Sequence, residues 1–215
     1  MKNFQHFVDT IQTYQAAFFP ALPGRRNHRK AGILVPILRD SVWTCILTLR
    51  PATLHTHSGE ICFPGGKPDP SDRNLQDTAL REANEEIGIQ NCQIIGRLSS
   101  MPLYTSDYRL EPFVGVAEPQ NLQANPTEVE TIIPISLLHA LQLSHIDGIP
   151  FQLAGEQHLS PIFDLHRLMS QPPTITPIYG GTAHVLYELL QLIATSLGQQ
   201  TPPLRSSKRR LPFMK

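Results

Sequence analysis

The alternation of apolar and polar positions divides the chain into short strands and a few helices. Apolar runs of strand length occupy residues 31–38 and 42–49, and the polar Arg-Asp-Ser turn between them favours antiparallel pairing. An Asp-Gly pair predicts a turn at Asp147 and Gly148. Three further segments are predicted as strands: 93–98, 149–154 and 159–164.

Three segments are predicted as helices outside the centre of the chain. Residues 3–18 have aromatic and aliphatic positions at helical spacing, and this apolar face must pack on the rest of the chain or on a second copy in a homodimer. Pro134 stands at a favoured first-turn position before a short helix at 135–143. A last helix is predicted at 182–197, with Thr182 as its cap.

The helix with the clearest ends lies between Asn74 and Gly88. Asn74 is a favoured N-cap, and Asp77 follows three residues later, as in a capping box. Gly88 stands where a left-handed residue closes a helix. An apolar stripe repeats at helical spacing between these ends: Ala79, Leu80, Ala83 and Ile87.

Three carboxylates gather on the polar side of this helix. Glu85 and Glu86 follow Glu82 by three and four residues, so the three share one face and repel one another. The last turn of a helix also disfavours negative charge. Such a conflict is expected at a functional site, and a hard cation such as Mg²⁺, which takes oxygen ligands, would resolve it. The planar fork of Arg81 can reach Glu85 and Asp72.

Two explanations of the residues before this helix stay open. Gly65 and Gly66 follow Phe-Pro, and two glycines in a tight turn let the backbone approach a ligand or a metal closely. Alternatively, the turn is ordinary and the glutamates belong to a solvated surface helix. The whole combination favours the first explanation.

The segment from Arg81 to Ile89, Arg-Glu-Ala-Asn-Glu-Glu-Ile-Gly-Ile, resembles the second half of the Nudix box. The first half departs from the usual box, because the interval from Gly66 to Arg81 is one residue longer and Asp72 stands for the first glutamate. The resemblance implies an α+β fold with a mixed β-sheet sandwiched between helices, and residues 110–117 resemble one of the core strands of that sheet. It also implies a hydrolase that acts on diphosphate bonds.

In that family the glutamates of the box bind divalent cations. The resemblance therefore implies that Glu82, Glu85 and Glu86 bind Mg²⁺ or Mn²⁺ and that Arg81 orients them. Many relatives draw a further glutamate from outside the box, as a metal ligand or a general base. Glu128 is the first choice here, and Glu130 is the second.

A second motif precedes the box. Ile-Leu-Thr at 46–48, Arg50 and Phe-Pro-Gly-Gly at 63–66 have the spacing of the coenzyme A diphosphatase branch of the family. His55 occupies the position of a second arginine, and Tyr179 stands where the branch has tryptophan. A histidine is mostly neutral at pH 7, so it would bind a phosphate more weakly than arginine does.

The branch implies a small-molecule substrate that resembles coenzyme A. Arg50, His55, Gly65 and Gly66 would contact it, while Glu85, Arg81 and Glu128 would carry catalysis. The general base would be Glu85 or Glu128. ADP-ribose, a dinucleotide or a nucleoside triphosphate is the alternative substrate, and a non-catalytic sensor of the same fold is the alternative function.

Composition excludes several classes of protein. The 215 residues include 18 basic and 18 acidic ones, and this balance does not indicate an electrostatic nucleic-acid binder. Three cysteines without a Cys-x-x-Cys pair favour reduced thiols in the cytoplasm. No apolar run is long enough to cross a membrane, and the first residues do not resemble a signal peptide.

The chain is expected to form one domain with extensions at both ends. Residues 1–30 would hold the first helix and a basic loop, and residues 31–197 would form the hydrolase domain. Residues 198–215 are expected to be a disordered tail, because they are rich in proline and basic residues.

Overall fold

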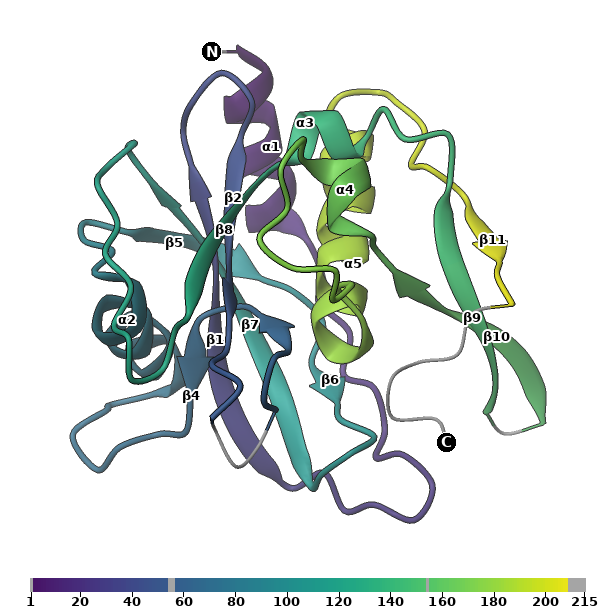
Figure 1. The fold of residues 1–215 in the computed structure, drawn as a ribbon, viewed down its shortest axis with the longest axis horizontal. Coiled ribbons are helices and arrows are strands. Elements are labelled where there is room, and N and C mark those ends of the chain that lie inside the picture. The colour runs from purple at the N-terminus through teal and green to yellow at the C-terminus, as the bar shows by residue number, and fades with distance from the viewer. Residues whose placement is uncertain (1, 54–56, 154, 209–215) are drawn as a thin grey trace.

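A computed structural model describes residues 2–53, 57–153 and 155–208 of the chain (Figure 1). Its centre is an eight-stranded sheet with the order β3-β2-β1-β7-β5, in which β4 pairs with β1, β6 with β7 and β8 with β2. The strands of this sheet are β1 (Arg29–Leu38), β2 (Thr44–Leu49), β3 (Ile61–Cys62), β4 (Gly65–Gly66), β5 (Gln93–Arg97), β6 (Met101–Pro102), β7 (Tyr108–Ala117) and β8 (Thr131–Ser136).

The sheet is mixed, as predicted. β1 and β7 run parallel through its middle, with register partners from Arg29 and Tyr108 to Leu38 and Ala117. All the other pairings in this sheet are antiparallel, including the expected one between β1 and β2. The apolar runs of β1 and β2 are almost entirely buried because both faces of the sheet are covered.

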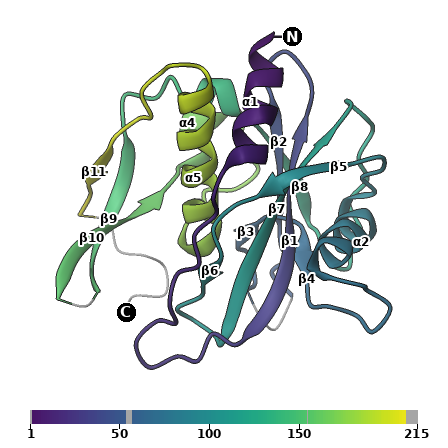
Figure 2. The same ribbon diagram turned by 180° about the vertical axis from the view of Figure 1, so that it is seen from behind.

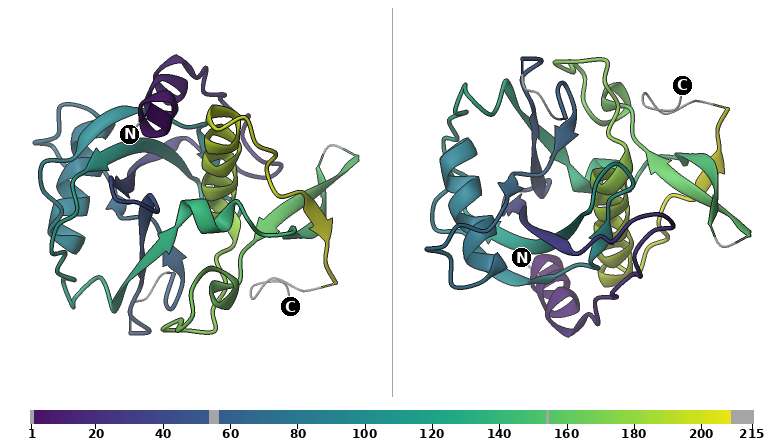
Figure 3. Two further views of the ribbon diagram at one scale, coloured as in Figure 1. Left: turned by 90° about the horizontal axis from the view of Figure 1, so that it is seen from above. Right: turned by 90° about the horizontal axis from the view of Figure 1, so that it is seen from below.

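Helices cover both faces of the sheet, so the predicted sandwich is confirmed (Figures 2 and 3). α2 (Leu75–Ile87) packs on one face, where its apolar stripe meets β1 and β7. α1 (Lys2–Thr13) and α5 (Gly180–Ser196) cover the other face and share the larger core. Among the described residues no helix has the length and apolar character needed to cross a membrane.

The close approach of α2 to the sheet depends on a glycine in β1. A Cβ atom on Gly32 would lie 2.3 Å from the carbonyl oxygen of Leu75, at the first turn of α2. Only a residue without a side chain lets the helix come so near the strand. This contact sets the position of the helix that carries the box carboxylates.

The aromatic face of α1 packs within the same chain. Phe4 and Phe7 contact Trp43, with ring centroids 5.1 and 5.4 Å from it. Both phenylalanines are buried, so this face does not require a second copy of the chain. The helix ends at Thr13, earlier than predicted, and Phe18 instead forms an isolated β-bridge with Ser100.

A second, three-stranded sheet extends from the main body, with the order β10-β9-β11 (Figure 1). Its strands are β9 (Ile146–Leu153), β10 (Glu156–Ile162) and β11 (Leu204–Ser206). The predicted turn at Asp147 and Gly148 is wrong, because both residues lie inside β9 and pair with β10. Disorder is also wrong for residues 204–206, which pair in parallel with β9.

Two predicted helix starts differ from the structure. Pro134 lies inside β8, where its missing N–H is tolerated because β8 pairs with β2 alone among the described strands and forms an edge. The short helix α3 (Leu137–Ala140) follows, and the Ser136 hydroxyl accepts a hydrogen bond from the His139 N–H. α5 starts at Gly180, before Thr182, and α4 (Leu165–Leu168) precedes it.

Candidate metal centre and substrate site

Local interactions define both ends of α2, as predicted, although the Asp77 carboxylate binds the Arg73 guanidinium instead of closing a capping box. The Asn74 side chain accepts hydrogen bonds from the N–H groups of Gln76 and Asp77 at 2.9 and 3.0 Å. Gly88 has a left-handed φ of +67°, and its N–H donates to the carbonyl of Asn84. With its ends determined in this way, the helix directs a row of carboxylates towards β4 and the loop before β8.

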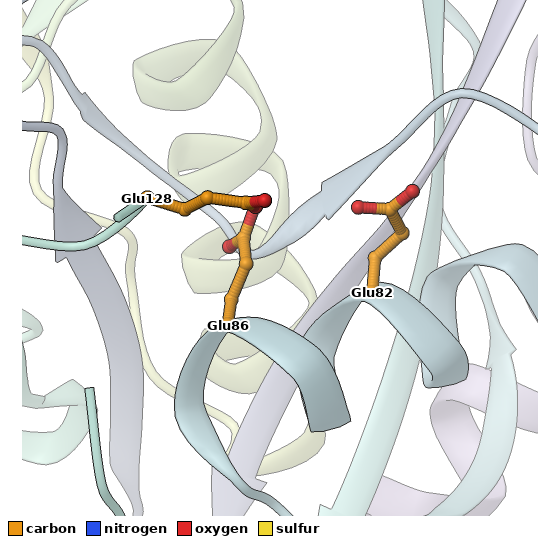
Figure 4. Close-up of side chains that lie close together, drawn as sticks. All are labelled: Glu82, Glu86 and Glu128. Atoms are coloured by element: carbon orange, nitrogen blue, oxygen red, sulfur yellow. The ribbon is translucent and has the colours of Figure 1, made fainter. Parts of the chain in front are cut away.

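Three carboxylates converge beside this helix: those of Glu82, Glu86 and Glu128 (Figure 4). One oxygen of each lies within 4.8 Å of the others. Glu128 comes from the loop between β7 and β8. The Asn125 N–H in that loop donates to the Glu86 carbonyl at 2.9 Å, which ties the loop to the end of α2. Of the two glutamates considered from the sequence, the structure brings Glu128 to the cluster, and Glu130 is exposed.

Glu86 is the buried member of the cluster, with 2% of its surface exposed. Its Oε2 atom is buried without a hydrogen-bond partner among the described residues. Burial is the main cause that raises the pKa of Glu86 to about 8. The neighbouring charges of Glu128 and Glu82 raise this pKa further, and the nearby Arg50 lowers it.

This environment fits a hard divalent cation. An ionised carboxylate that is buried without a partner is costly, and two further carboxylates increase the cost. Mg²⁺ and Mn²⁺ accept carboxylate oxygens as ligands, and a bound cation would supply the missing partner of the Glu86 oxygen. Glu82, Glu86 and Glu128 are therefore the residues that would hold it.

Glu85 lies apart from the three converging carboxylates. Its Oε2 accepts a hydrogen bond from Nη1 of Arg81 at 2.9 Å, and 54% of its side chain is exposed. The predicted ion pair with Arg81 is thus present. The roles of Glu85 as a metal ligand or a general base stay predictions.

Arg81 connects the carboxylates of the box. Its Nε and Nη2 donate to the two oxygens of Asp72, each at 3.0 Å, and Nη2 also donates to Glu82. The hydrogen bonds from Arg81 are the main cause that holds the pKa of Asp72 well below its ordinary value. Asp72, which stands in place of the usual first glutamate, therefore holds Arg81 in position.

The two glycines form the short strand β4, and the prediction of a tight turn is wrong at these positions. They pair with β1, where Gly66 faces Gly32 and Gly65 faces Ile33. A Cβ atom on Gly66 would lie 2.5 Å from the carboxyl carbon of Glu82, so a side chain there would displace this carboxylate. The strand therefore leaves room for the cluster.

Arg50 follows β2 and lies close enough to Glu86 to lower the pKa of its carboxyl group. The Nε atom of Arg50 is buried without a hydrogen-bond partner among the described residues. A guanidinium group this close to the carboxylate cluster suits a phosphate oxygen by its charge and its fork geometry. His55, the other predicted phosphate contact, lies outside the described residues.

The sequence did not reveal a connection between the loop after β2 and the start of α5. Glu60 accepts a hydrogen bond from the Tyr179 hydroxyl, and one of its oxygens lies 2.8 Å from Nδ1 of His57. Burial raises the pKa of Glu60, but the His57 and Tyr179 contacts outweigh it and the net shift is downward. The unusual Tyr179 therefore has a local partner, which no short-range pattern indicates.

Comparisons with known proteins agree with this geometry. The NUDIX domain family matches residues 27–150. The "Uncharacterized Nudix hydrolase NudL" of Photorhabdus laumondii is 37% identical over 192 residues, covering 86% of this chain and 96% of that protein. The protein of the same name from Pectobacterium atrosepticum is 33% identical over 153 residues. This match covers 70% of this chain and 79% of that protein.

Solved structures show only a distant likeness. A MutT protein from Methanosarcina mazei is 19% identical, with a TM-score of 0.42, over 61% of this chain and 86% of its own. The Nudix domain of Shewanella oneidensis NrtR, solved with ADP ribose, is 18% identical, with a TM-score of 0.43. This match covers 63% of this chain and 86% of the NrtR chain. These scores are too low to add to the assignment.

The family match covers more than half of the chain, and the first relative aligns over nearly its whole length. Nudix hydrolases act on nucleoside diphosphate derivatives and generally use divalent metal ions, which the carboxylate cluster is suited to bind. The chain belongs to the Nudix hydrolase family and is a hydrolase of diphosphate bonds.

Proposed function

We propose that the protein hydrolyses the diphosphate bond of coenzyme A or its derivatives. The products are 3′,5′-ADP and 4′-phosphopantetheine or its acyl form. The observation that carries this proposal is the cluster of Glu82, Glu86 and Glu128, with a buried unpartnered oxygen on Glu86 and the guanidinium of Arg50 close enough to lower the pKa of that carboxyl group. This arrangement can hold both a cation and the phosphate that the cation neutralises.

We assign a separate role to each residue of the site. Mg²⁺ or Mn²⁺ bound there supplies charge neutralisation for the diphosphate and lowers the pKa of a water molecule. Glu82, Glu86 and Glu128 hold the cation, and Arg81 keeps Glu82 in place. Arg50 binds a phosphate oxygen. Phosphoryl transfer requires mainly positioning and electrostatic stabilisation, and these contacts supply both.

Proton transfer requires a carboxylate near the attacking water. Glu85 and Glu128 are the two choices. Glu128 belongs to the cluster, whereas Glu85 is held by Arg81. The ion pair with Arg81 can orient Glu85 as a base, so Glu85 and Glu128 are both kept in the proposal.

The choice of coenzyme A rests on the motif before the box. Arg50 and the Phe-Pro-Gly-Gly segment have the spacing of the coenzyme A branch. The three cysteines are free thiols, as a cytoplasmic location would require, and we keep that location as part of the proposal. A homodimer also stays a proposal, although the aromatic face of α1 is covered within the chain.

A substrate panel tests the proposal. The purified protein is incubated with coenzyme A, an acyl-coenzyme A, ADP-ribose and NADH, each with Mg²⁺ and with Mn²⁺, and the products are identified by mass spectrometry. Glu86→Gln removes a cluster carboxylate, and Glu130→Gln is the control because Glu130 is exposed.

The expected result is 3′,5′-ADP from coenzyme A in the wild type and in Glu130→Gln, and none in Glu86→Gln. Turnover of only ADP-ribose or NADH would keep the chemistry and reject coenzyme A. An absence of turnover together with an absence of metal binding would leave a ligand sensor of the same fold.

A further inference from the structure

Two cations flank the ring of Tyr108 at the start of β7. The guanidinium carbon of Arg29 lies 5.8 Å from the ring centroid, and the Nζ atom of Lys67 lies 5.6 Å from it. Both distances are within the range of cation–π contacts. Arg29 and Tyr108 are register partners in parallel strands, so their side chains lie on the same face of the sheet.

Neither cation is neutralised by a carboxylate in the described parts of the chain, whereas the adjacent Lys30 lies 4.0 Å from Glu111. Arg29 and Lys67 are both exposed, and Tyr108 is partly buried. Two positive groups near one ring, without a counter-ion, attract an anion, and each of them can donate hydrogen bonds to it.

The backbone around these side chains is fixed by a buried asparagine. Asn27 is 3% exposed and has a left-handed φ of +43°. Its side-chain oxygen accepts a hydrogen bond from the Leu22 N–H at 3.0 Å. Its Nδ2 donates to the carbonyl oxygens of Leu103 and Ser106 before β7 and to that of Tyr108, the first residue of β7. The segments that lead into Arg29 and Tyr108 are therefore held together before any ligand binds.

The backbone of Lys67 connects this pair of cations to the carboxylate cluster. Lys67 directly follows Gly66, whose Cα faces the carboxylate of Glu82. The carbonyl of Lys67 accepts a hydrogen bond from Nη2 of Arg81 at 3.2 Å. A diphosphate bound at the cluster would thus have Lys67 near one end, and a substrate could extend from there towards Tyr108 and Arg29.

We propose that Arg29, Lys67 and Tyr108 form a subsite for a phosphomonoester that the substrate carries in addition to its diphosphate. The fork of Arg29 and the ammonium group of Lys67 donate to the phosphate oxygens, and the ring of Tyr108 holds the two cations in place. The subsite selects nucleotides with a third phosphate, such as the 3′-phosphate of coenzyme A. This inference rests on the proposed function and names the group that decides its substrate.

The test compares two substrates that differ only in this phosphate. The ratio of kcat/KM for coenzyme A to that for dephospho-coenzyme A is measured with Mg²⁺ for the wild type and for Arg29→Gln/Lys67→Gln. The control is Arg39→Gln/Arg205→Gln, which removes two exposed cations elsewhere. Charge-assisted hydrogen bonds predict a wild-type ratio of about 10 to 100. The ratio should fall close to 1 in the first variant and stay at the wild-type value in the control.

A binding measurement separates this inference from the proposed function. Calorimetry without metal compares 3′,5′-ADP with AMP, which lacks the second phosphomonoester. Tighter binding of 3′,5′-ADP to the wild type, lost in Arg29→Gln/Lys67→Gln, supports the subsite even where coenzyme A is not hydrolysed. Equal binding of both nucleotides to the wild type, or a preference that the variant keeps, overturns the subsite. Matching melting temperatures show that the variants are folded.

Discussion

At Glu86 the fold places a carboxylate out of contact with water and leaves one of its oxygens without a hydrogen-bond donor. A buried polar atom without a partner destabilises a protein by about 1–3 kcal/mol, and a charged one by more. Glu82 and Glu128 add repulsion at the same point. The arrangement of these residues therefore favours a bound cation and lowers the stability of the fold when no cation is bound.

Replacing Glu128 by glutamine should weaken metal-dependent turnover. The substitution keeps the shape of the side chain but removes one of the three charges that converge at the cluster. We expect the Mg²⁺ concentration for half-maximal activity to rise by about 10-fold to 100-fold, a range that even outer-shell changes produce. Activity is measured against Mg²⁺ concentration.

Glu130→Gln is the matched control for this change, since it removes the same charge two residues away on an exposed side chain. It should leave the Mg²⁺ dependence unchanged. If both variants responded equally, Glu128 would not be a ligand.

Residues within the box were predictable because their geometry is local. The spacing of Glu82 and Glu86 and the reach of Arg81 to Asp72 follow from one helix and the turn before it. The resemblance ranked Glu128 before Glu130, but no local geometry showed which of the two reaches the cluster. That choice depends on the hydrogen bond between Asn125 and Glu86, which joins two distant segments.

At the scale of elements, the N-cap of α2 is open to a direct test. Asn74→Ala removes the side-chain oxygen that accepts from two N–H groups of the first turn. The free energy of unfolding should fall by about 1 kcal/mol in Asn74→Ala. It should stay close to the wild-type value in Asn74→Ser, because serine is also a favoured N-cap. Urea denaturation measures both, and an unchanged stability of Asn74→Ala would show that the cap is dispensable.

α5 carries a histidine whose protonation the fold opposes. His184 is largely buried, its Nε2 lies 3.0 Å from the Ser160 hydroxyl, and burial lowers its pKa to about 4. The unfolded chain therefore binds this proton first, at its ordinary pKa of about 6.5. Stability should be lost as the pH falls from about 6.5 to 4, by up to about 1.4 kcal/mol per pH unit.

His184→Gln removes the titratable imidazole, so the loss of stability at low pH should be smaller in this variant. The comparison of urea unfolding at pH 7.5 and pH 5 for the two proteins isolates His184 from the other histidines. A variant that loses as much stability as the wild type between these pH values would contradict the account.

Elements with strong local signals were predictable, and those defined by pairing were not. The caps of α2 and the apolar runs of β1 and β2 match the structure closely. Pro134 suggested a helix, yet an edge strand also accepts proline. Asp147 and Gly148 suggested a turn, but β10 and β11 hold both residues in a strand.

At the scale of the whole molecule, the segment after α5 returns to complete the second sheet. β11 pairs with β9, and the Ile146 N–H donates to the Pro203 carbonyl at 3.0 Å. The Tyr187 hydroxyl also donates to the Pro202 carbonyl. Proline and basic residues suggested disorder, because composition does not indicate a strand edge that is formed elsewhere in the fold.

A chain that ends at Gly198 should therefore be less stable by about 1–3 kcal/mol, since it loses several hydrogen bonds of about 1 kcal/mol each. A chain that ends at Lys208 keeps every described contact and serves as the control. Thermal unfolding compares the two. Equal melting temperatures would show that β11 adds nothing to the stability of the domain.

The central claim is that Glu82, Glu86 and Glu128 form the cation site of this hydrolase. The most direct measurement is a titration with Mn²⁺ in which electron paramagnetic resonance reports the free ion. The wild type and Glu130→Gln should bind Mn²⁺ alike, and Glu86→Gln should bind it about 10-fold to 100-fold more weakly. Equal binding by the wild type and Glu86→Gln, or no binding by the wild type, would contradict the claim.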